Sequence, residues 1–442
     1  MEDNFEKKKS NTFLKVLLPI ILIIAVVGAG AYFLLNKSNI KPVNAFKNVV
    51  EKAFTALEVK EDAKTASAKI ELTASLDSDN LNVRAIKQYV EAAKITLNGE
   101  ADLNKQIMKY NALVDFDKDT LVNADFILQN GKIYAYAKDF FSKYVEIDSE
   151  DLDMEEMTVM IEEMFKISNK ISKKETNKLL KDIENEVLKF LDEQEYETSK
   201  EEIKVGNDTV KATKATLKLN EKQLAKLMTN VLTVIKNSEY INSLITTNEV
   251  NFKEEIEDAI EELKDVDTED MTIKINLYTT GVAGEIVKAE IIAKEEDEEV
   301  ITINYEKESK EKASVVFEAE GTELKLEINK KDKNTTAYTL VLPEELEGMT
   351  ITVEHTKEGQ YKGKIVLTVK VPSEILAGYN IDDDVTAKLN VVYDASYNVN
   401  VEETNVENSI KINDFTEQDQ QELLTNFQNS KLYSLISTFM GE

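Results

Sequence analysis

The residues that could carry acid–base or nucleophilic chemistry are few in this chain of 442 residues. There is no cysteine and a single histidine, His355. In "ITVEHT" this histidine follows Ile351 and Val353 at every second position, so all three lie on the apolar side of an expected strand. The sequence names no oriented partner, which a general base needs. The serines have no nucleophile-elbow context, and no glycine-rich loop could cradle a phosphate. We therefore expect a protein that is not an enzyme, with no catalytic residues and no cofactor.

Carboxylates are abundant, with 84 Asp and Glu residues, so their spacing alone does not identify a metal site. The stretch "DFDKDT" begins like a calcium-binding loop, with Asp115, Asp117 and Asp119. Such a loop has glycine at its sixth position and glutamate at its twelfth, where this chain has Thr120 and Phe126. The aspartates at 382–384 could hold a cation at a turn, although a solvated acidic loop explains them as well. We predict no metal site.

The candidate ligand-binding residues are apolar. Methionines recur at the spacing of one helix face, and unbranched, polarizable side chains of this kind adapt to ligands of variable shape. An aromatic hairpin precedes them in the sequence. Together they predict a groove for an apolar ligand, lined by Tyr134, Tyr136, Phe140, Phe141, Met154, Met157, Met160 and Met164. The alternative is that both groups are ordinary core residues, which is the more frequent role of such side chains.

The segment from Val16 to Leu35, "VLLPIILIIAVVGAGAYFLL", contains no charged residue. A helix of this length extends about 30 Å, which matches the hydrocarbon core of a membrane. We expect a membrane-spanning helix at 16–35, preceded by a head at 1–15 and followed by a linker at 36–43. The alternative is a signal peptide cleaved near 29–31, but the apolar run continues past that position through Tyr32 and Phe33.

Lysines are more numerous before this segment than after it. Those before it are Lys7, Lys8, Lys9 and Lys15, and those after it are Lys37 and Lys41. Because positive residues favour the cytoplasmic side, we expect a single-pass protein of the cell membrane with a cytoplasmic N-terminus. The remainder, 44–442, would then be extracellular.

The extracellular part has the pattern of an α+β domain. An amphipathic helix from residue 44 is followed by "ASAKIELTASLD", whose strict alternation is typical of a half-buried antiparallel strand. Asn130 and Gly131 predict a two-residue hairpin turn. From residue 271 to about 401, strands recur at short intervals and end with "YNVNVEE". We expect a large curved antiparallel sheet, a meander like a half-barrel, packed on helices and divided, if at all, into lobes at about 44–219 and 220–442.

Net charge limits the partners. The chain carries −30 at pH 7, and a polyanion repels phosphate backbones, so we expect no nucleic-acid binding. Wall polymers and cations are compatible with an acidic surface. No thiol is available for lipidation or disulfides, so the stability must come from a conventional core.

The order of elements resembles that of curved half-barrel proteins of the lipoprotein-carrier type, with the hairpin "ILQNGKIYAYAKDFFSKYVEI" between alternating strands and helices. The ending "NDFTEQDQQELLTNFQNSKLYSLI" is similar to that of single-span surface proteins of low-GC Gram-positive bacteria. The resemblance implies a bent sheet that holds acyl chains against helices. We expect a membrane-anchored extracellular binding or scaffold protein with a groove for an apolar or lipid-like ligand. The alternative is a purely structural envelope protein without a small-molecule ligand.

Overall fold

The computed structural model describes residues 42–61, 63–147, 168, 170–244, 252–264, 266, 271–281, 285–295, 298–319, 321–342, 346 and 348–440. The expected head, the membrane segment and the linker up to residue 41 lie outside these ranges. So do Met154, Met157, Met160 and Met164 of the expected groove. Within the ranges, no helix combines the length and the apolar character that crossing a membrane requires.

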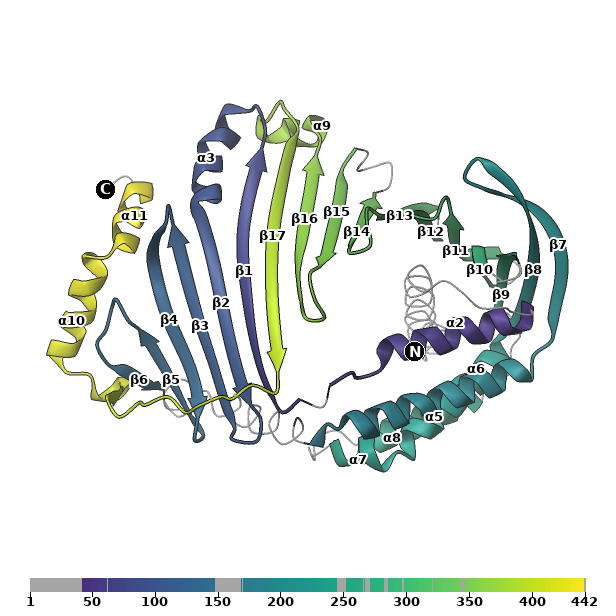
Figure 1. Cartoon of the computed structure of the whole chain (residues 1–442), viewed down its shortest axis with the longest axis horizontal. Helices are drawn as coiled ribbons and strands as arrows, with labels where there is room; N and C mark the ends of the chain where they lie inside the picture. Colours follow the sequence, from purple (N-terminus) through teal and green to yellow (C-terminus); the bar gives the residue numbers. More distant parts are fainter. Residues whose placement is uncertain are drawn as a thin grey trace, which may run out of the picture. The chain divides into compact units, whose positions relative to one another are not determined.

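The chain forms two compact units, and each unit is built from two separate stretches of sequence (Figure 1). Unit 1 comprises Met1–Lys60 and Ser172–Lys325. Unit 2 comprises Glu61–Ile171 and Leu326–Glu442. In the sequence-based division each lobe is one continuous stretch, whereas each unit here consists of two separate stretches of the chain. Both units combine antiparallel strands with helices, which confirms the expected α+β class.

Unit 1 is a curved sheet that turns around a layer of helices, as Figure 1 shows. Its strands pair antiparallel in chain order and are β7 (Tyr196–Val205), β8 (Asp208–Asn220), β9 (Met271–Thr280), β10 (Glu285–Glu295), β11 (Glu298–Lys307) and β12 (Lys312–Ala319). Its helices are α2 (Pro42–Leu57), α5 (Lys173–Asp192), α6 (Glu221–Lys236), α7 (Glu239–Leu244) and α8 (Phe252–Lys264). Strand β13 (Thr322–Lys330) contains the boundary between the units.

The core of unit 1 lies between these helices and strands. Phe46 of α2 and Phe190 of α5 are buried beside Leu217 of β8, and the rings of Phe46 and Tyr196 lie 5.3 Å apart. Helix α6 starts at Asn220, whose side chain accepts a hydrogen bond from the backbone N–H of Gln223 while Gln223 bonds back to Asn220. Asn220 and Gln223 thus form a capping box.

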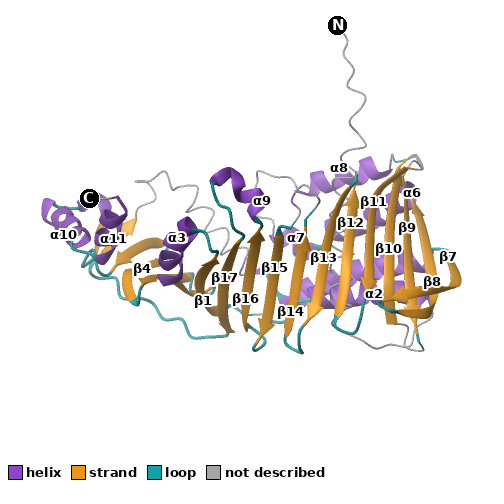
Figure 2. Cartoon of the chain, turned by 90° about the horizontal axis from the view of Figure 1, so that it is seen from above, coloured by secondary structure: helices purple, strands orange, loops and turns teal. Residues whose placement is uncertain are grey.

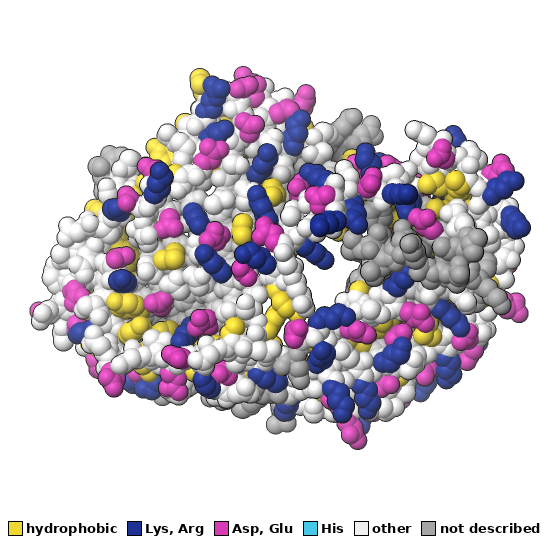
Figure 3. Space-filling model, in the orientation of Figure 1, with side chains coloured by type: hydrophobic (Ala, Val, Ile, Leu, Met, Phe, Trp, Pro, Cys, Tyr) yellow, Lys and Arg dark blue, Asp and Glu magenta, His cyan; other side chains and the backbone are white. Residues whose placement is uncertain are grey.

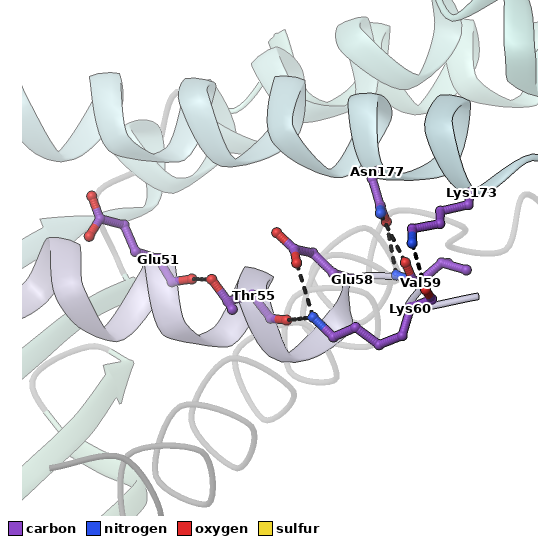
Figure 4. Close-up of polar contacts among 7 residues, drawn as sticks. All are labelled: Glu51, Thr55, Glu58, Val59, Lys60, Lys173 and Asn177. Atoms are coloured by element: carbon purple, nitrogen blue, oxygen red, sulfur yellow. Dashed lines mark hydrogen bonds and ion pairs between the residues drawn. The ribbon is translucent and has the colours of Figure 1, made fainter. Parts of the chain in front are cut away.

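The end of α2 is held to α5 by one amide side chain (Figure 4). Asn177 accepts a hydrogen bond from the backbone N–H of Val59 at 2.8 Å and donates one to the carbonyl of Val59 at 3.0 Å. Lys173 adds a bond from its Nζ to the carbonyl of Lys60 at 2.6 Å. These contacts give partners to backbone groups of Val59 and Lys60, which follow the last residue of α2, Leu57. They fix the chain where it leaves α2.

Replacing Asn177 with alanine should lower the free energy of opening around the end of α2 by about 1–3 kcal/mol, because two backbone groups of Val59 lose their partner. Hydrogen exchange of the Val59 amide would measure this loss. A suitable control is Asn242→Ala, which removes an exposed hydrogen bond of 3.3 Å to the carbonyl of Lys236. Unchanged protection of Val59 in Asn177→Ala would contradict the role of this amide.

Unit 2 contains the longest antiparallel sheet region described. Its strands, in the order in which they pair, are β14 (Thr335–Val341), β15 (Thr350–Lys357), β16 (Lys362–Val371), β17 (Val385–Tyr397), β1 (Thr65–Asp77), β2 (Ala93–Asp102), β3 (Ile107–Phe116), β4 (Asp119–Gln129), β5 (Lys132–Ala137), β6 (Tyr144–Ile147) and the short parallel β18 (Ser409–Lys411). The helical elements are α3 (Leu81–Ala92), α9 (Ser373–Leu376), η3 (Ala377–Tyr379), η4 (Ile412–Asp414), α10 (Glu417–Gln428) and α11 (Lys431–Met440). Figure 2 shows α3 and α9 on the same side of the neighbouring strands.

Local sequence signals of unit 2 are largely confirmed. Asn130 and Gly131 have φ values of 55° and 70°, as the predicted hairpin turn requires. The strand expected from "YNVNVEE" is wrong, because β17 ends at Tyr397 and Asn398 has a left-handed φ of 57°. After Asn398 the backbone forms hydrogen bonds with side chains. For example, Nζ of Lys105 donates to the carbonyl of Val401 at 2.7 Å.

Candidate ligand-binding face

The alternating strands of unit 2 bring their apolar residues to one side of the sheet. Residues that pair across antiparallel strands share a face. Leu72 of β1 pairs with Ile95 of β2 and with Val391 of β17. The same register continues to β3 and β4, where Tyr110 pairs with Phe126. One face of this part of the sheet is therefore almost entirely apolar.

Large side chains on this side remain exposed to solvent. We call the surface that they form the apolar face; its most exposed members, between 37% and 54% accessible, are Ile95, Leu97, Tyr110, Phe126, Leu389 and Tyr397. Helix α3 lies over one end of it, where the rings of Tyr89 and Phe116 are 6.3 Å apart. Proteins rarely leave contiguous apolar patches of more than a few hundred Å² uncovered, because each Å² costs about 25 cal/mol in water. The apolar face is therefore the candidate ligand-binding surface of unit 2.

The opposite side of β1, β2, β16 and β17 is polar and forms cross-strand ion pairs, whereas the opposite side of β3 and β4 buries Ile107 and Ile127. Glu71 of β1 pairs with Lys69 at 2.7 Å and with Lys94 of β2 at 3.0 Å, and hydrogen bonds from these two lysines lower the pKa of Glu71. Lys362 and Asp394 pair at 3.1 Å between β16 and β17. Figure 3 shows lysines and carboxylates interspersed over the strands β1, β2, β16 and β17. This solvated side needs no partner.

The aromatic hairpin of the expected groove packs on the C-terminal segment. Phe141 is only 2% exposed, and its ring lies 5.1 Å from that of Phe415. The rings of Phe140 and Phe427 of α10 are 6.1 Å apart. Tyr134 is buried, and Tyr136 stacks at 4.6 Å on Tyr144. Phe140 and Phe141 thus attach the C-terminal segment, and a role for the four residues in ligand contact stays a prediction.

A partly buried ion pair strengthens this attachment. Asp419 of α10 is buried and lies 2.7 Å from Lys143, which follows the aromatic hairpin. Its carboxylate also accepts the hydroxyl of Thr416 at 2.6 Å and the backbone N–H of Thr416 at 3.0 Å. The hydroxyl oxygen of Thr416 accepts the backbone N–H of Asp419 at 3.2 Å, so Thr416 caps α10. The bond from Lys143, followed by those from Thr416, lowers the pKa of Asp419 to about 2.

This pKa predicts how the attachment of α10 depends on pH. Because the pKa in the folded state lies below the unfolded value of about 3.9, the contribution of Asp419 is complete above that value and is lost as the pH falls through about 2. Asp419→Asn keeps the shape and removes the charge. The hydrogen-exchange rates of α10 amides should therefore differ strongly between the unaltered chain and Asp419→Asn at pH 5. The two sets of rates should become similar near pH 2. An equal difference at both pH values would contradict the assignment.

The polar candidates from the sequence have structural partners. The carboxylate of Asp382 accepts a hydrogen bond from the side chain of Asn80 at 2.8 Å, and that of Asp384 pairs with Lys370 at 3.0 Å. Asp115 accepts the hydroxyl of Thr120 at 2.7 Å beside a hairpin turn. In the described part of the chain, no group of three or more His, Cys, Asp or Glu side chains could hold a metal ion.

Comparisons with known proteins give little further information. No protein-family model matches the chain, and no curated protein matches it. Solved structures that the search aligned include the P. putida toluene transporter TodX, with 7% identity, 79% of this chain and 94% of that chain covered, and a TM-score of 0.13. A deltaS2 mutant of the TodX monoaromatic hydrocarbon channel aligns with 10% identity over the same shares and the same TM-score of 0.13. Similarity this low carries no argument about fold or function.

Proposed function

We propose that this chain is a membrane-anchored extracellular binding protein and that the apolar face of unit 2 holds an apolar or amphiphilic ligand. The observation that carries the proposal is the row of large apolar side chains on β17, β2, β3 and β4 that stays exposed to solvent. The other side of β1, β2, β16 and β17 carries solvated ion pairs. Antiparallel sheets normally cover such a face with other elements. The resemblance to half-barrel lipoprotein carriers supports the same type of ligand.

The anchor in this proposal is the segment from Val16 to Leu35. Its support is the uncharged sequence and the lysines that precede it. External protease added to intact protoplasts should digest everything beyond the linker. Protection of the chain from the protease, or a mature N-terminus at Tyr32 in the medium, would contradict the anchor.

Organic extraction of the purified full-length chain tests the ligand. Lipids that surround a membrane span would appear in any such extract, so the comparison needs a matched variant. Leu97→Asn with Leu389→Asn keeps the span and makes the apolar face polar at two exposed positions. We expect the unaltered chain to carry an additional amphiphile that the variant lacks. Identical extracts would favour the alternative, a structural envelope protein whose charge of −30 faces wall polymers and cations.

A further inference from the structure

One end of the apolar face has a polar corner formed by three strands. His355 of β15, the single histidine of the chain, lies on the apolar face in register with Ile365 of β16. Tyr393 of β17 is in register with Gly363 of β16. The Nε2 atom of His355 and the Oη atom of Tyr393 are 2.7 Å apart, so this hydrogen bond crosses β16. Lys357, two residues beyond His355, is on the same side of β15.

Glycine at position 363 permits this arrangement. A Cβ atom there would lie 2.6 Å from the Oη atom of Tyr393 and 2.5 Å from the carbonyl oxygen of Thr356, closer than real Cβ contacts occur. The side chain of Tyr393 therefore lies across β16 at the one position of that strand that has no side chain. The polar pair is held flat against an otherwise apolar surface.

The corner has hydrogen-bonding capacity that the described residues do not use. Burial, followed by the charge of Lys357, lowers the pKa of His355, so the imidazole is neutral at pH 7. When Tyr393 donates its hydroxyl proton to Nε2, the proton of the neutral imidazole is on Nδ1. No partner for Nδ1 is found among the residues that the structure describes. Nδ1 can then donate to an oxygen atom of a ligand.

Lys357 lies on the side of the sheet that carries the apolar face. Lys331 pairs with Glu354, and Lys362 pairs with Asp394. Within the described ranges, no carboxylate forms an ion pair with Lys357, which is exposed. An exposed cation beside a neutral donor pair, at the end of an apolar surface, is complementary to a negatively charged head group.

We propose that His355 and Lys357 bind the anionic head of a long-chain amphiphile whose tail lies on the apolar face, and that Tyr393 holds the imidazole in position. This inference rests on the proposed function and names the ligand class. Carboxylate and phosphate heads share the required chemistry, since both present oxygen acceptors with negative charge. The tail supplies the apolar contact, so an isolated anion is not the ligand.

Ligands that differ only in their head group test the proposal. The full-length chain in nanodiscs is titrated calorimetrically with dodecanoate, dodecyl phosphate and 1-dodecanol, and empty nanodiscs correct for partition into the bilayer. We expect the two anions to bind about 10-fold or more tightly than the alcohol, because only the charged heads form charge-assisted hydrogen bonds with the corner. The ratio between the two anions shows whether a free fatty acid or a phosphate head is preferred. Inorganic phosphate should not bind.

Variants of the corner separate head recognition from folding. His355→Gln with Lys357→Gln should lose the preference for the anions and keep the affinity for 1-dodecanol, whereas Lys357→Arg should keep the preference. Equal binding of all three ligands to the unaltered chain would contradict recognition of the head group at the corner, while the apolar face would remain a ligand site. An equal loss for acid and alcohol in the double variant would also contradict this recognition, because a structural role would weaken both. If no ligand binds, both the corner and the proposed function fail.

Discussion

A chain carrying Leu97→Glu and Leu389→Glu is expected to bind a long-chain amphiphile at least about 100-fold more weakly than the unaltered chain, because each leucine contributes about 1.5–3 kcal/mol when a ligand covers it. Both side chains are on the apolar face, with 41% and 37% of their surface exposed. Their substitution removes little internal packing, so the free energy of unfolding should change by no more than about 1 kcal/mol each.

The matched control for this variant adds the same charge to the opposite side of the same sheet. Ser75 of β1 pairs with Lys388, and Asn390 of β17 pairs with Thr73, so both lie on the polar side. Ser75→Glu with Asn390→Glu should leave amphiphile binding unchanged. Titration of dodecanoate against both variants makes the comparison. Equal loss in the two variants would mean that net charge, and not the apolar face, determines binding.

Phe141→Ala is expected to lower the free energy of unfolding of unit 2 by about 3–5 kcal/mol, the usual cost of truncating a buried phenylalanine. The ring of Phe141 contacts Phe415, and Lys143 Nζ lies 6.0 Å from its centroid. Its loss should also loosen α10 and α11, which the aromatic hairpin holds. Hydrogen exchange of β3, β4 and β5 amides would measure stability, and exchange of α10 amides would measure the attachment.

Phe126→Ala is the control for this prediction. Phe126 has 51% of its surface exposed on the apolar face, so its truncation should cost less than about 1 kcal/mol of stability and should weaken amphiphile binding. Phe141→Ala is thus expected to lower mainly the stability of unit 2, and Phe126→Ala mainly the affinity for the amphiphile. If Phe141→Ala left stability intact and abolished binding, the ligand would be at the aromatic hairpin.

Local patterns in the sequence predict the elements of this fold well. The alternation in "ASAKIELTASLD" corresponds to β1, and the turn at Asn130 forms as expected. Each of these depends on neighbouring residues, so the sequence contains the whole signal. The strand expected after Tyr397 fails for a local reason as well, since Asn398 takes a left-handed conformation that ends the ladder.

The candidate site depends on pairing between distant residues, which one sequence does not reveal. Leu72 meets Val391 across more than half of the chain, and only this register makes the apolar residues of separate strands one surface. Periodicity predicts that such residues face inward, but not that they remain uncovered. The aromatic hairpin was the clearest apolar signal in the sequence, yet Phe140 and Phe141 contact Phe427 and Phe415 of the C-terminal segment.

The most direct test of the apolar face uses the absence of cysteine from this chain. Leu389→Cys and Lys388→Cys place an environment-sensitive fluorophore at adjacent positions of β17 on opposite sides of the sheet. On addition of dodecanoate, the emission of the fluorophore at position 389 should shift to shorter wavelength, and that at position 388 should not change. Equal shifts at the two positions, or no shift at position 389, would contradict ligand binding on the apolar face.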